Sequence, residues 1–533
     1  MVTTAQAVAG TLADRGITRA FGLPGGEVLV LIDELRKAGI EFVLMRHEAN
    51  AGIAAAVYGK LQRQPGVVIA TLGPGAANLM LPIANAHLDQ EPLLAITAQL
   101  PGELPKSHTH QLLPLHDVFR PMCRIVETLT SANAIETMRY ALDGCFERPY
   151  GASYVTMSAK EAVRPMTAAA LSAEGQPKAK MAPPADVRSA ALVLEARLAK
   201  AQRPLVLIGL SIDARNAQRL RDWVGKWNLP VAVTPKVKGV VDETSPNFVG
   251  VISGMAADGL MVEALQASDC LIGFGLDPVE VDKTWHAELP IEWLLESANA
   301  TGCVPEGVSL IDHAALLDVL VRTPPPRAWE QPFADFQRKR AAMLTGTASA
   351  KHTMWPGDII RALSSAVPPD TIVTTDVGSH KYLFGQFWPS RHPETFWMSN
   401  GLSGMAYGLS AAIGAKLARP ETPVLAAVGD GGFSMNAQEL ETAERIGAPF
   451  ITVVLEDGSY SLIKLAQENR KLEPYRMDFG RIDTVKMAES CGVHAMRTSN
   501  ADELASAVEQ AIAKKKSLVA AIPIHYGDYR KLF

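Results

Sequence analysis

The sequence predicts an α/β protein with three doubly wound parallel-sheet domains, and three observations lead to this prediction. The chain has 533 residues, which is too long for one hydrophobic core. Short apolar runs alternate with helix-like segments along its length, as in parallel sheets whose crossovers are helices. Two segments without apolar periodicity, 166–186 and 322–332, divide the chain as linkers. We therefore expect domains over 1–165, 187–322 and 345–533.

The predicted strands are continuous apolar runs, as expected for strands buried on both faces. They lie, in chain order, at 66–72, 92–98, 203–210, 229–235, 269–276, 370–376, 423–430 and 449–455. In such sheets ligands bind beyond the carboxyl ends of the strands, so the residues that follow each strand are the first candidates for a site.

The composition excludes several classes of protein. With 48% hydrophobic and 20% charged residues and a net charge of −5, the chain is an ordinary globular protein that is not expected to bind nucleic acid. No apolar stretch approaches the ~20 residues of a membrane span, and residues 1–17 form an amphipathic pattern rather than a signal peptide. Five scattered cysteines without a CxxC pair argue against a disulfide framework or zinc site. We expect a cytoplasmic protein without a membrane partner.

Two acids mark the ends of consecutive strands in the third block. The strand at 423–428 runs into the sequence GDGG. A helix follows, which Gly447 ends, and the next strand, at 450–455, leads to Asp457. In a β-α-β unit both strand ends lie at the same sheet edge, so Asp430 and Asp457 could converge there and bind Mg²⁺ together with phosphate oxygens. The alternative is that these are two unrelated acidic turns.

The segment "GDGGFSMNAQELETAERIGAP", with Asp457 placed 27 residues after Asp430, resembles the diphosphate and metal motif of thiamine-diphosphate enzymes, in their acetolactate synthase branch. The resemblance implies that Asp430, Asp457 and the Ser459 carbonyl hold Mg²⁺. Many members carry Asn where this chain has Asp457, and the aspartate is similar to the FAD-independent catabolic acetolactate synthases. Other cofactor contacts implied in this block are Gly378, Ser379, His380, Ser403, Met405, Gly429, Gly431, Gly432 and Tyr460, with Met405 supporting the bent cofactor.

The first block carries a candidate catalytic acid. Taken alone, Glu48 in the first turn of a helix would be a partner of the helix dipole. However, "RHEANAGIAAAVYG" resembles the catalytic-glutamate segment of the family, which implies that Glu48 shares a proton with the aminopyrimidine ring. "THQ" at 109–111 similarly implies that His110 and Gln111 lie over the reacting carbon, whereas alone they would be surface loop residues. Further cofactor contacts implied here are Pro24, Gly25, Gly26, Thr71, Gly75 and Asn78.

The resemblance also implies the roles of the three domains. They correspond to a pyrimidine-binding, a central Rossmann-like and a diphosphate-binding domain. In this family active sites are shared between chains, so the resemblance implies a homodimer or homotetramer with shared sites. In the central block, "SGMAADG" (253–259) and "GLDPVEVD" (275–282) depart from the flavin-contacting segments of biosynthetic relatives. We therefore expect thiamine diphosphate and Mg²⁺ as cofactors and no FAD.

The implied reaction is decarboxylation of a 2-oxo acid, with pyruvate as first choice, followed by carboligation to a second carbonyl compound. Leu462, Ile463 and Ala466 would line the substrate pocket, and Ala466 replaces the tryptophan that selects the acceptor in biosynthetic synthases. The wider pocket leaves two alternatives, a simple decarboxylase of the benzoylformate type and acyl transfer to another aldehyde. A non-catalytic regulatory subunit is a further alternative, which predicts loss of Glu48 or of the aspartates. The polar segment 466–480 is a lid or a surface excursion.

Overall fold

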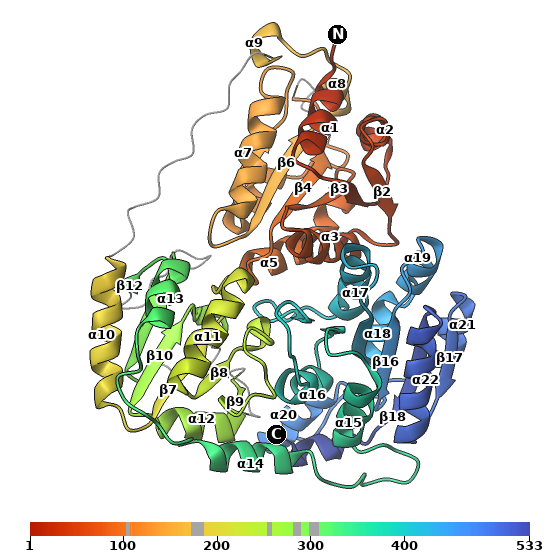
Figure 1. Cartoon of the computed structure of the whole chain (residues 1–533). Helices are drawn as coiled ribbons and strands as arrows, with labels where there is room; N and C mark the ends of the chain where they lie inside the picture. The colour runs from red at the N-terminus through yellow and green to blue at the C-terminus, as the bar shows by residue number, and fades with distance from the viewer. Residues whose placement is uncertain are drawn as a thin grey trace. The chain divides into compact units, whose positions relative to one another are not determined.

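The computed structural model describes residues 1–102, 107, 109–171, 186–252, 258–280, 289–297 and 309–532. They form three six-stranded sheets, and the pairings between their described strands are all parallel (Figure 1). The predicted fold class is therefore confirmed. The first sheet has the order β2-β1-β3-β4-β6-β5, and the third, β14-β13-β15-β16-β18-β17, repeats this topology. The second sheet, β12-β11-β10-β7-β8-β9, has the Rossmann order.

The first sheet is covered on both faces. Its strands are β1 (Arg19–Gly22), β2 (Glu41–Leu44), β3 (Gly66–Ala70), β4 (Leu93–Ala98), β5 (Cys123–Thr128) and β6 (Ala152–Met157). Its helices are α1 (Thr4–Asp14), α2 (Leu29–Lys37), α3 (Glu48–Gln62), α4 (Pro74–Asn78), α5 (Met80–Leu88), α6 (Leu115–Phe119), α7 (Ala134–Phe146), α8 (Ala159–Ala162) and α9 (Ala168–Leu171). α3 and α5 pack on one face, and α1, α2 and α7 on the other. Full burial of β3, β4 and β6 explains their unbroken apolar sequences.

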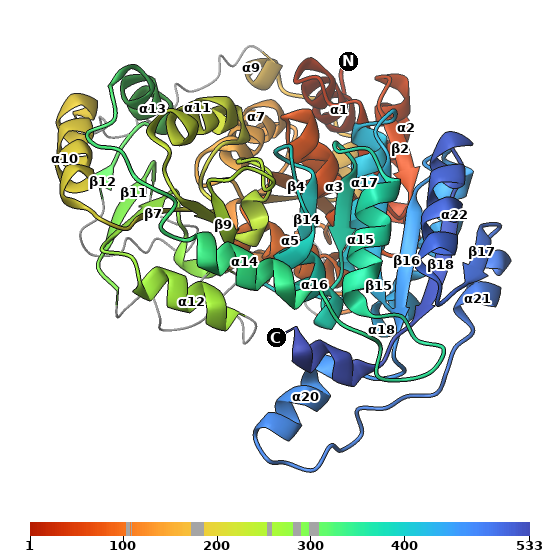
Figure 2. The same cartoon turned by 60° about the horizontal axis from the view of Figure 1, so that its bottom comes forward.

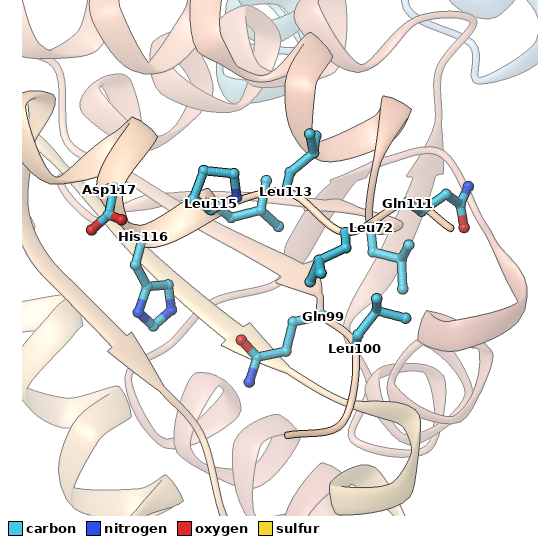
Figure 3. A pocket seen from close by; sticks show the side chains of 10 residues that line it. Leu72, Gln99, Leu100, Gln111, Leu113, Leu115, His116 and Asp117 are labelled. Carbon is cyan, nitrogen blue, oxygen red and sulfur yellow. The ribbon is translucent and has the colours of Figure 1, made fainter. Parts of the chain in front are cut away.

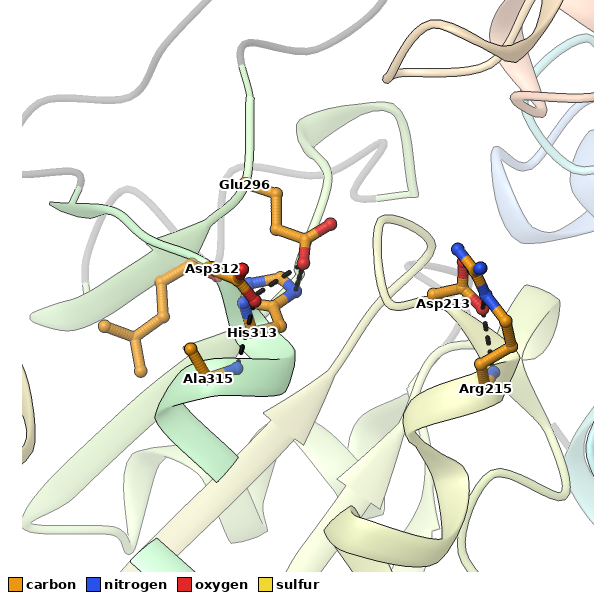
Figure 4. Close-up of polar contacts among 7 residues, drawn as sticks. Asp213, Arg215, Glu296, Asp312, His313 and Ala315 are labelled. Atoms are coloured by element: carbon orange, nitrogen blue, oxygen red, sulfur yellow. Dashed lines mark hydrogen bonds and ion pairs between the residues drawn. The ribbon is translucent and has the colours of Figure 1, made fainter. Parts of the chain in front are cut away.

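The second sheet also separates its alternate side chains into two cores. Its strands are β7 (Pro204–Ile208), β8 (Val231–Val233), β9 (Phe248–Val251), β10 (Cys270–Phe274), β11 (Ile291–Leu295) and β12 (Ser309–Leu310). The helices α10 (Val187–Lys200), α11 (Ala217–Trp227) and α13 (His313–Arg322) cover one face, and α12 (Gly259–Gln266) and α14 (Ala334–Met343) the other. Near its carboxyl edge, Arg215 pairs with Asp213, and the main-chain N–H of His313 donates to Glu296 (Figure 4).

The third sheet carries the GDGG motif. Its strands are β13 (Ile372–Thr375), β14 (Phe396–Met398), β15 (Val424–Gly429), β16 (Ile451–Glu456), β17 (His494–Arg497) and β18 (Leu518–Pro523). Its helices are α15 (Pro356–Ala366), α16 (Ser379–Phe387), α17 (Tyr407–Ala418), α18 (Asp430–Asn436), α19 (Glu439–Arg445), α20 (Ser461–Asn469), α21 (Thr484–Ser490) and α22 (Ala501–Ala513). The single helix expected after GDGG is thus two helices, α18 and α19, and Gly447, with φ +66°, follows the second.

The described residues divide into two compact units. One holds the first sheet with residues 413–420 and 441–448, and the other holds the second and third sheets. Within the first unit, small residues let α3 lie close to its neighbours: a Cβ on Gly414 would lie 2.2 Å from the Ala54 main-chain oxygen. The domain boundaries stay a prediction.

Several expectations fall partly outside the described residues. Of the linker at 166–186, the structure describes only residues 166–171 and 186. Residues 168–171 form the short helix α9. The central segments at 253–259 and 275–282 are described only at 258–259 and 275–280. Within the described part of the chain, no helix has the length and apolarity to cross a bilayer. The described cysteines, Cys123, Cys145, Cys270 and Cys491, are free thiols.

Candidate active site

The two predicted metal-binding aspartates lie together at the carboxyl edge of the third sheet. β15 and β16 are adjacent parallel strands, so the residues that follow them emerge side by side. Asp430 opens α18, and its Oδ2 accepts the Gly458 N–H at 2.8 Å, while Asp457 Oδ1 accepts the Ser459 N–H at 3.1 Å. Gly458 has φ +71°, a left-handed conformation that favours glycine in this turn. The two aspartate-bearing turns are therefore one hydrogen-bonded structure.

Burial makes this acidic pair a suitable site for a cation. Burial raises the pKa of Asp457 to about 7, and the nearby charge of Asp430 acts in the same direction. Burial also raises the pKa of Asp430. A divalent cation would relieve this loss of solvation, because hard carboxylate oxygens are the ligands that Mg²⁺ prefers. The described residues contain no group of three or more acidic, histidine or cysteine side chains suited to a metal, so main-chain and phosphate oxygens would complete this donor set.

A glycine-lined cradle lies beside the aspartates. The His380 ring covers two glycines. A Cβ added to Gly378 would lie 2.7 Å from the ring, and one added to Gly429 would lie 2.9 Å from it. His380 Nε2 is buried and has no hydrogen-bond partner among the described residues. Burial lowers the pKa of His380 to about 3, so the ring is neutral at physiological pH. Ser379 is buried, and its hydroxyl lies 3.2 Å from that of Ser461. The bare main chain at Gly378 and Gly429 is a feature that fits a diphosphate group.

The aspartate Asp376, which the sequence analysis did not select, organises this cradle. It is buried, and its carboxylate accepts the N–H groups of Ala406 (3.0 Å) and Tyr407 (3.4 Å). A Cβ on Gly432 would lie 2.0 Å from its Oδ2, so Gly432 makes room for this carboxylate. Burial raises the pKa of Asp376 to about 6. Asp376 directly follows β13, and this position at the end of a strand is the sequence feature that could have identified it as a site residue.

The segment that precedes α17 brings Met405 to the GDGG turn. A Cβ on Gly431 would lie 3.6 Å from Met405 Cε and 3.0 Å from the Tyr460 ring, so both side chains converge above Gly431. Ser403 has φ +55° and accepts a hydrogen bond from the buried Lys381 ammonium at 3.0 Å. Lys381 is a second residue that the sequence analysis missed.

The predicted pocket residues lie on α20. Leu462 and Ala466 are half-buried, and Ile463 is 52% exposed. Figure 2 shows α20 beyond the carboxyl edge of the third sheet, with the long segment that leads from it to α21. The helix therefore lies at the sheet edge where ligands bind in parallel α/β domains.

Glu48 is the first residue of α3, and its environment is buried. Glu48 is only 8% exposed, and its Oε2 accepts the Asn78 Nδ2–H at 2.9 Å. A Cβ on Gly75 would lie 3.3 Å from the other oxygen, Oε1. The structure thus brings together Glu48, Gly75 and Asn78, which lie on α3 and α4. A solvated helix-dipole partner would not be enclosed in this way.

The loop after β1 lies against the loop after β3. A Cβ on Gly25 would lie 2.5 Å from that of Thr71, so the close approach requires glycine. The Thr71 hydroxyl donates to Glu27, a residue that the sequence analysis did not select, at 2.5 Å. Pro24 and Gly26 are exposed.

His110 and Gln111 are exposed, and Gln111 lines a pocket of about 220 Å³ (Figure 3). Gln111 has φ +57° and lies against Gly73, whose added Cβ would be 3.0 Å from the Gln111 side chain. Leucine and proline side chains form much of the pocket wall, and polar side chains, among them Gln99 and His116, form the rest. The other lining residues are Leu72, Leu100, Leu112, Leu113, Pro114, Leu115 and Asp117.

Comparison with protein families identifies this combination of fold and site. Three models of thiamine pyrophosphate (thiamine diphosphate) enzymes match: the N-terminal TPP-binding domain at residues 2–118, the central domain at 193–293 and the C-terminal TPP-binding domain at 376–522. Together they match more than half of the chain and cover part of each of the three sheets. The chain belongs to the thiamine pyrophosphate enzyme family.

Among the relatives are acetolactate synthases that this chain matches over more than nine tenths of their length. The acetolactate synthase of Bacillus subtilis (strain 168) is 28% identical, with 98% of this chain and 93% of that protein covered. The catabolic acetolactate synthase of Raoultella terrigena is 27% identical, with 98% and 95% covered. The acetolactate synthase isozyme 2 large subunit of Escherichia coli (strain K12) is 29% identical, with 95% and 92% covered. This protein is therefore an acetolactate synthase-like, thiamine-diphosphate-dependent enzyme.

Proposed function

We propose that the enzyme decarboxylates a 2-oxo acid, with pyruvate as first choice, and joins the remaining acyl unit to a second carbonyl compound. The observation that carries the proposal is the enclosed Glu48 carboxyl group, held by Asn78 on a chain whose relatives are named acetolactate synthases. A regulatory subunit would not need this carboxyl group or the aspartate pair.

The residues fit thiamine diphosphate and Mg²⁺ in distinct roles. Asp430, Asp457 and the Ser459 carbonyl would hold Mg²⁺, and the main chain at Gly431 and Gly432 with His380 would hold the diphosphate. When bound, thiamine diphosphate supplies a carbon nucleophile and an electron sink for the loss of CO₂.

The residues of the first sheet would move protons. Glu48 Oε2 is engaged by Asn78, which leaves Oε1 to exchange a proton with the aminopyrimidine. His110 and Gln111, exposed at the end of the first sheet, would donate to the carbonyl oxygens of the substrates. The pocket beside Gln111 offers room for the acceptor.

The test is a product analysis of the purified enzyme with thiamine diphosphate, Mg²⁺ and a panel of 2-oxo acids. We expect CO₂ from pyruvate together with a 2-hydroxy-3-oxo acid, identified by mass spectrometry. Release of an aldehyde alone would assign a simple decarboxylase, and a product from an added aldehyde alone would assign acyl transfer to that acceptor. If no 2-oxo acid lost CO₂, the proposal would be wrong.

We also propose that no flavin takes part and that the active site is shared between two chains. The departures from the flavin-contacting segments at 253–259 and 275–282 support the first point. The separate compact units that contain Glu48 and Asp430 are compatible with the second. An absorption band near ~450 nm in the purified enzyme would contradict the flavin-free proposal.

A further inference from the structure

We propose that residues Met477–Phe479, called here the strap, are a positioning element for the metal-binding loop Gly458–Tyr460. This inference rests on the proposed cofactors, and it assigns a role to part of the segment 466–480. Two main-chain hydrogen bonds join the strap and the loop: Tyr460 N–H to Met477 O (2.9 Å) and Phe479 N–H to Gly458 O (3.1 Å). Ser459 and Asp478 are thereby paired as antiparallel strand residues.

This pairing determines the direction of the Ser459 main chain. In an antiparallel pair, the residue between two hydrogen-bonded neighbours turns its own N–H and C=O to the opposite side. The Ser459 N–H accordingly donates to Asp457 Oδ1 at 3.1 Å, so its carbonyl faces the side of Asp457 and away from the strap. The strap thus presents the Ser459 carbonyl where the proposed Mg²⁺ set needs a third oxygen.

The side chains of the strap contact both the GDGG turn and α20. The Phe479 ring lies 5.2 Å from the Tyr460 ring, and Phe479 Cζ would be 3.6 Å from a Cβ on Gly431. Asp478 pairs with Lys464 of α20 at 2.8 Å, and the Lys464 side chain is only 16% exposed. The strap therefore connects the GDGG turn with the helix that carries the pocket residues, and Phe479 forms part of the apolar wall above Gly431.

Two substitutions at Phe479 separate the main-chain contribution from that of the ring. Phe479→Ala removes the ring and keeps the N–H donor to Gly458, whereas Phe479→Pro removes both. Glu473→Gln, at an exposed position of the same segment, is the matched control. The first readout is tryptophan fluorescence during titration of each protein with Mg²⁺ at a fixed thiamine diphosphate concentration. The second is hydrogen exchange of the Ser459–Ser461 amides, followed by mass spectrometry.

We expect Phe479→Pro to weaken Mg²⁺ binding by about tenfold or more and to speed exchange at Ser459–Ser461, because it releases a group that orients a metal ligand. Phe479→Ala should change Mg²⁺ affinity by less than about threefold but raise KM for the 2-oxo acid more than it lowers kcat, because the wall and not the metal loop is altered. Glu473→Gln should match the wild type in all readouts.

The outcomes separate this inference from the proposed function. If Phe479→Pro bound Mg²⁺ with wild-type affinity and its loop amides exchanged at the wild-type rate, the strap would have no positioning role. If the wild-type enzyme decarboxylated no 2-oxo acid but Phe479→Pro still weakened Mg²⁺ binding, the proposed reaction would fail and the strap would stand.

Discussion

At the scale of single residues, neighbouring acids have different environments. Glu456 pairs through both carboxylate oxygens with Arg497, each at 3.0 Å, whereas Asp457 lies buried beside Asp430. Successive side chains point to opposite faces at the end of β16. Glu456 therefore faces Arg497, and Asp457 faces the end of β15. This difference decides which acid is available to a cation.

Glu48→Gln should lower CO₂ release from pyruvate by at least about 100-fold, because an amide cannot exchange the proton that Glu48 is proposed to carry. The substitution keeps the size of the side chain, so the melting temperature should change little. Glu136→Gln, in the first turn of α7, is the control for a helix-dipole effect and should leave the rate unchanged. A Glu48→Gln enzyme that released CO₂ at the wild-type rate would remove Glu48 from the mechanism.

At the scale of elements, the carboxyl ends of β15 and β16 bring two acids into one buried site. The pKa of Asp457, about 7, lies above its ordinary value of 3.8. The folded chain without metal therefore binds this proton more tightly than the unfolded chain. The contribution of Asp457 to stability is fully present below about pH 4 and is lost as the pH rises through about 7.

Asp457→Asn should consequently stabilise the metal-free protein at about pH 8, by at most a few kcal/mol, and leave its stability nearly unchanged at about pH 4. In the wild type, Mg²⁺ affinity should rise between about pH 6 and pH 8 as Asp457 loses its proton. In the variant this rise should be much smaller. Urea unfolding at about pH 4 and pH 8 measures the first effect, and Mg²⁺ titration at about pH 6 and pH 8 measures the second. An equally steep pH dependence of Mg²⁺ affinity in the variant would contradict the assignment.

A buried ion pair in the segment after β8 is hydrogen-bonded to the end of α16 within one compact unit. Lys238 lies 2.6 Å from Glu243, with side-chain exposures of 0% and 1%, and also donates to Trp388 O at 2.9 Å. Burial lowers the pKa of Lys238 to about 8 and raises that of Glu243, and the charge of each partner opposes these shifts.

Glu243→Gln should destabilise the protein by about 3 kcal/mol at neutral pH, because it leaves the Lys238 ammonium buried without its counter-charge. The loss should be smaller at about pH 9, where Lys238 gives up its proton more readily. Glu421→Gln removes the partner of Lys515 in a pair that is 84% and 72% exposed, and it should change stability by less than about 1 kcal/mol. Equal losses in the two variants, measured by urea unfolding, would show that burial does not strengthen the pair.

At the scale of the whole molecule, Glu48 and Asp430 lie in different compact units of the chain. The proposed sharing of active sites makes a specific prediction for mixed dimers. A chain with Glu48→Gln and a chain with Asp430→Asn would each be inactive alone. In a mixed dimer with shared sites, one site would combine an intact Glu48 from one chain with an intact Asp430 from the other.

Co-expression of the two variants with different affinity tags should therefore restore about a quarter of the wild-type activity, since half of randomly formed dimers are mixed and half of their sites are intact. The doubly tagged fraction should carry this activity. If each site used Glu48 and Asp430 of the same chain, the mixed dimers would stay inactive.

The fold class followed from the sequence alone, and so did the choice of strand ends at which the proposed chemistry would lie. Continuous apolar runs identify strands buried on both faces, and Asp430 and Asp457 follow such runs, because local periodicity reflects local burial. Glu48 instead follows the partly exposed edge strand β2. Only the tertiary structure showed that Asp376 organises the start of α17, that Lys381 reaches Ser403 and that the strap pairs with Gly458–Tyr460. These contacts join residues that are far apart in the chain. They depend on strand order and packing, which the pattern of any one segment does not encode.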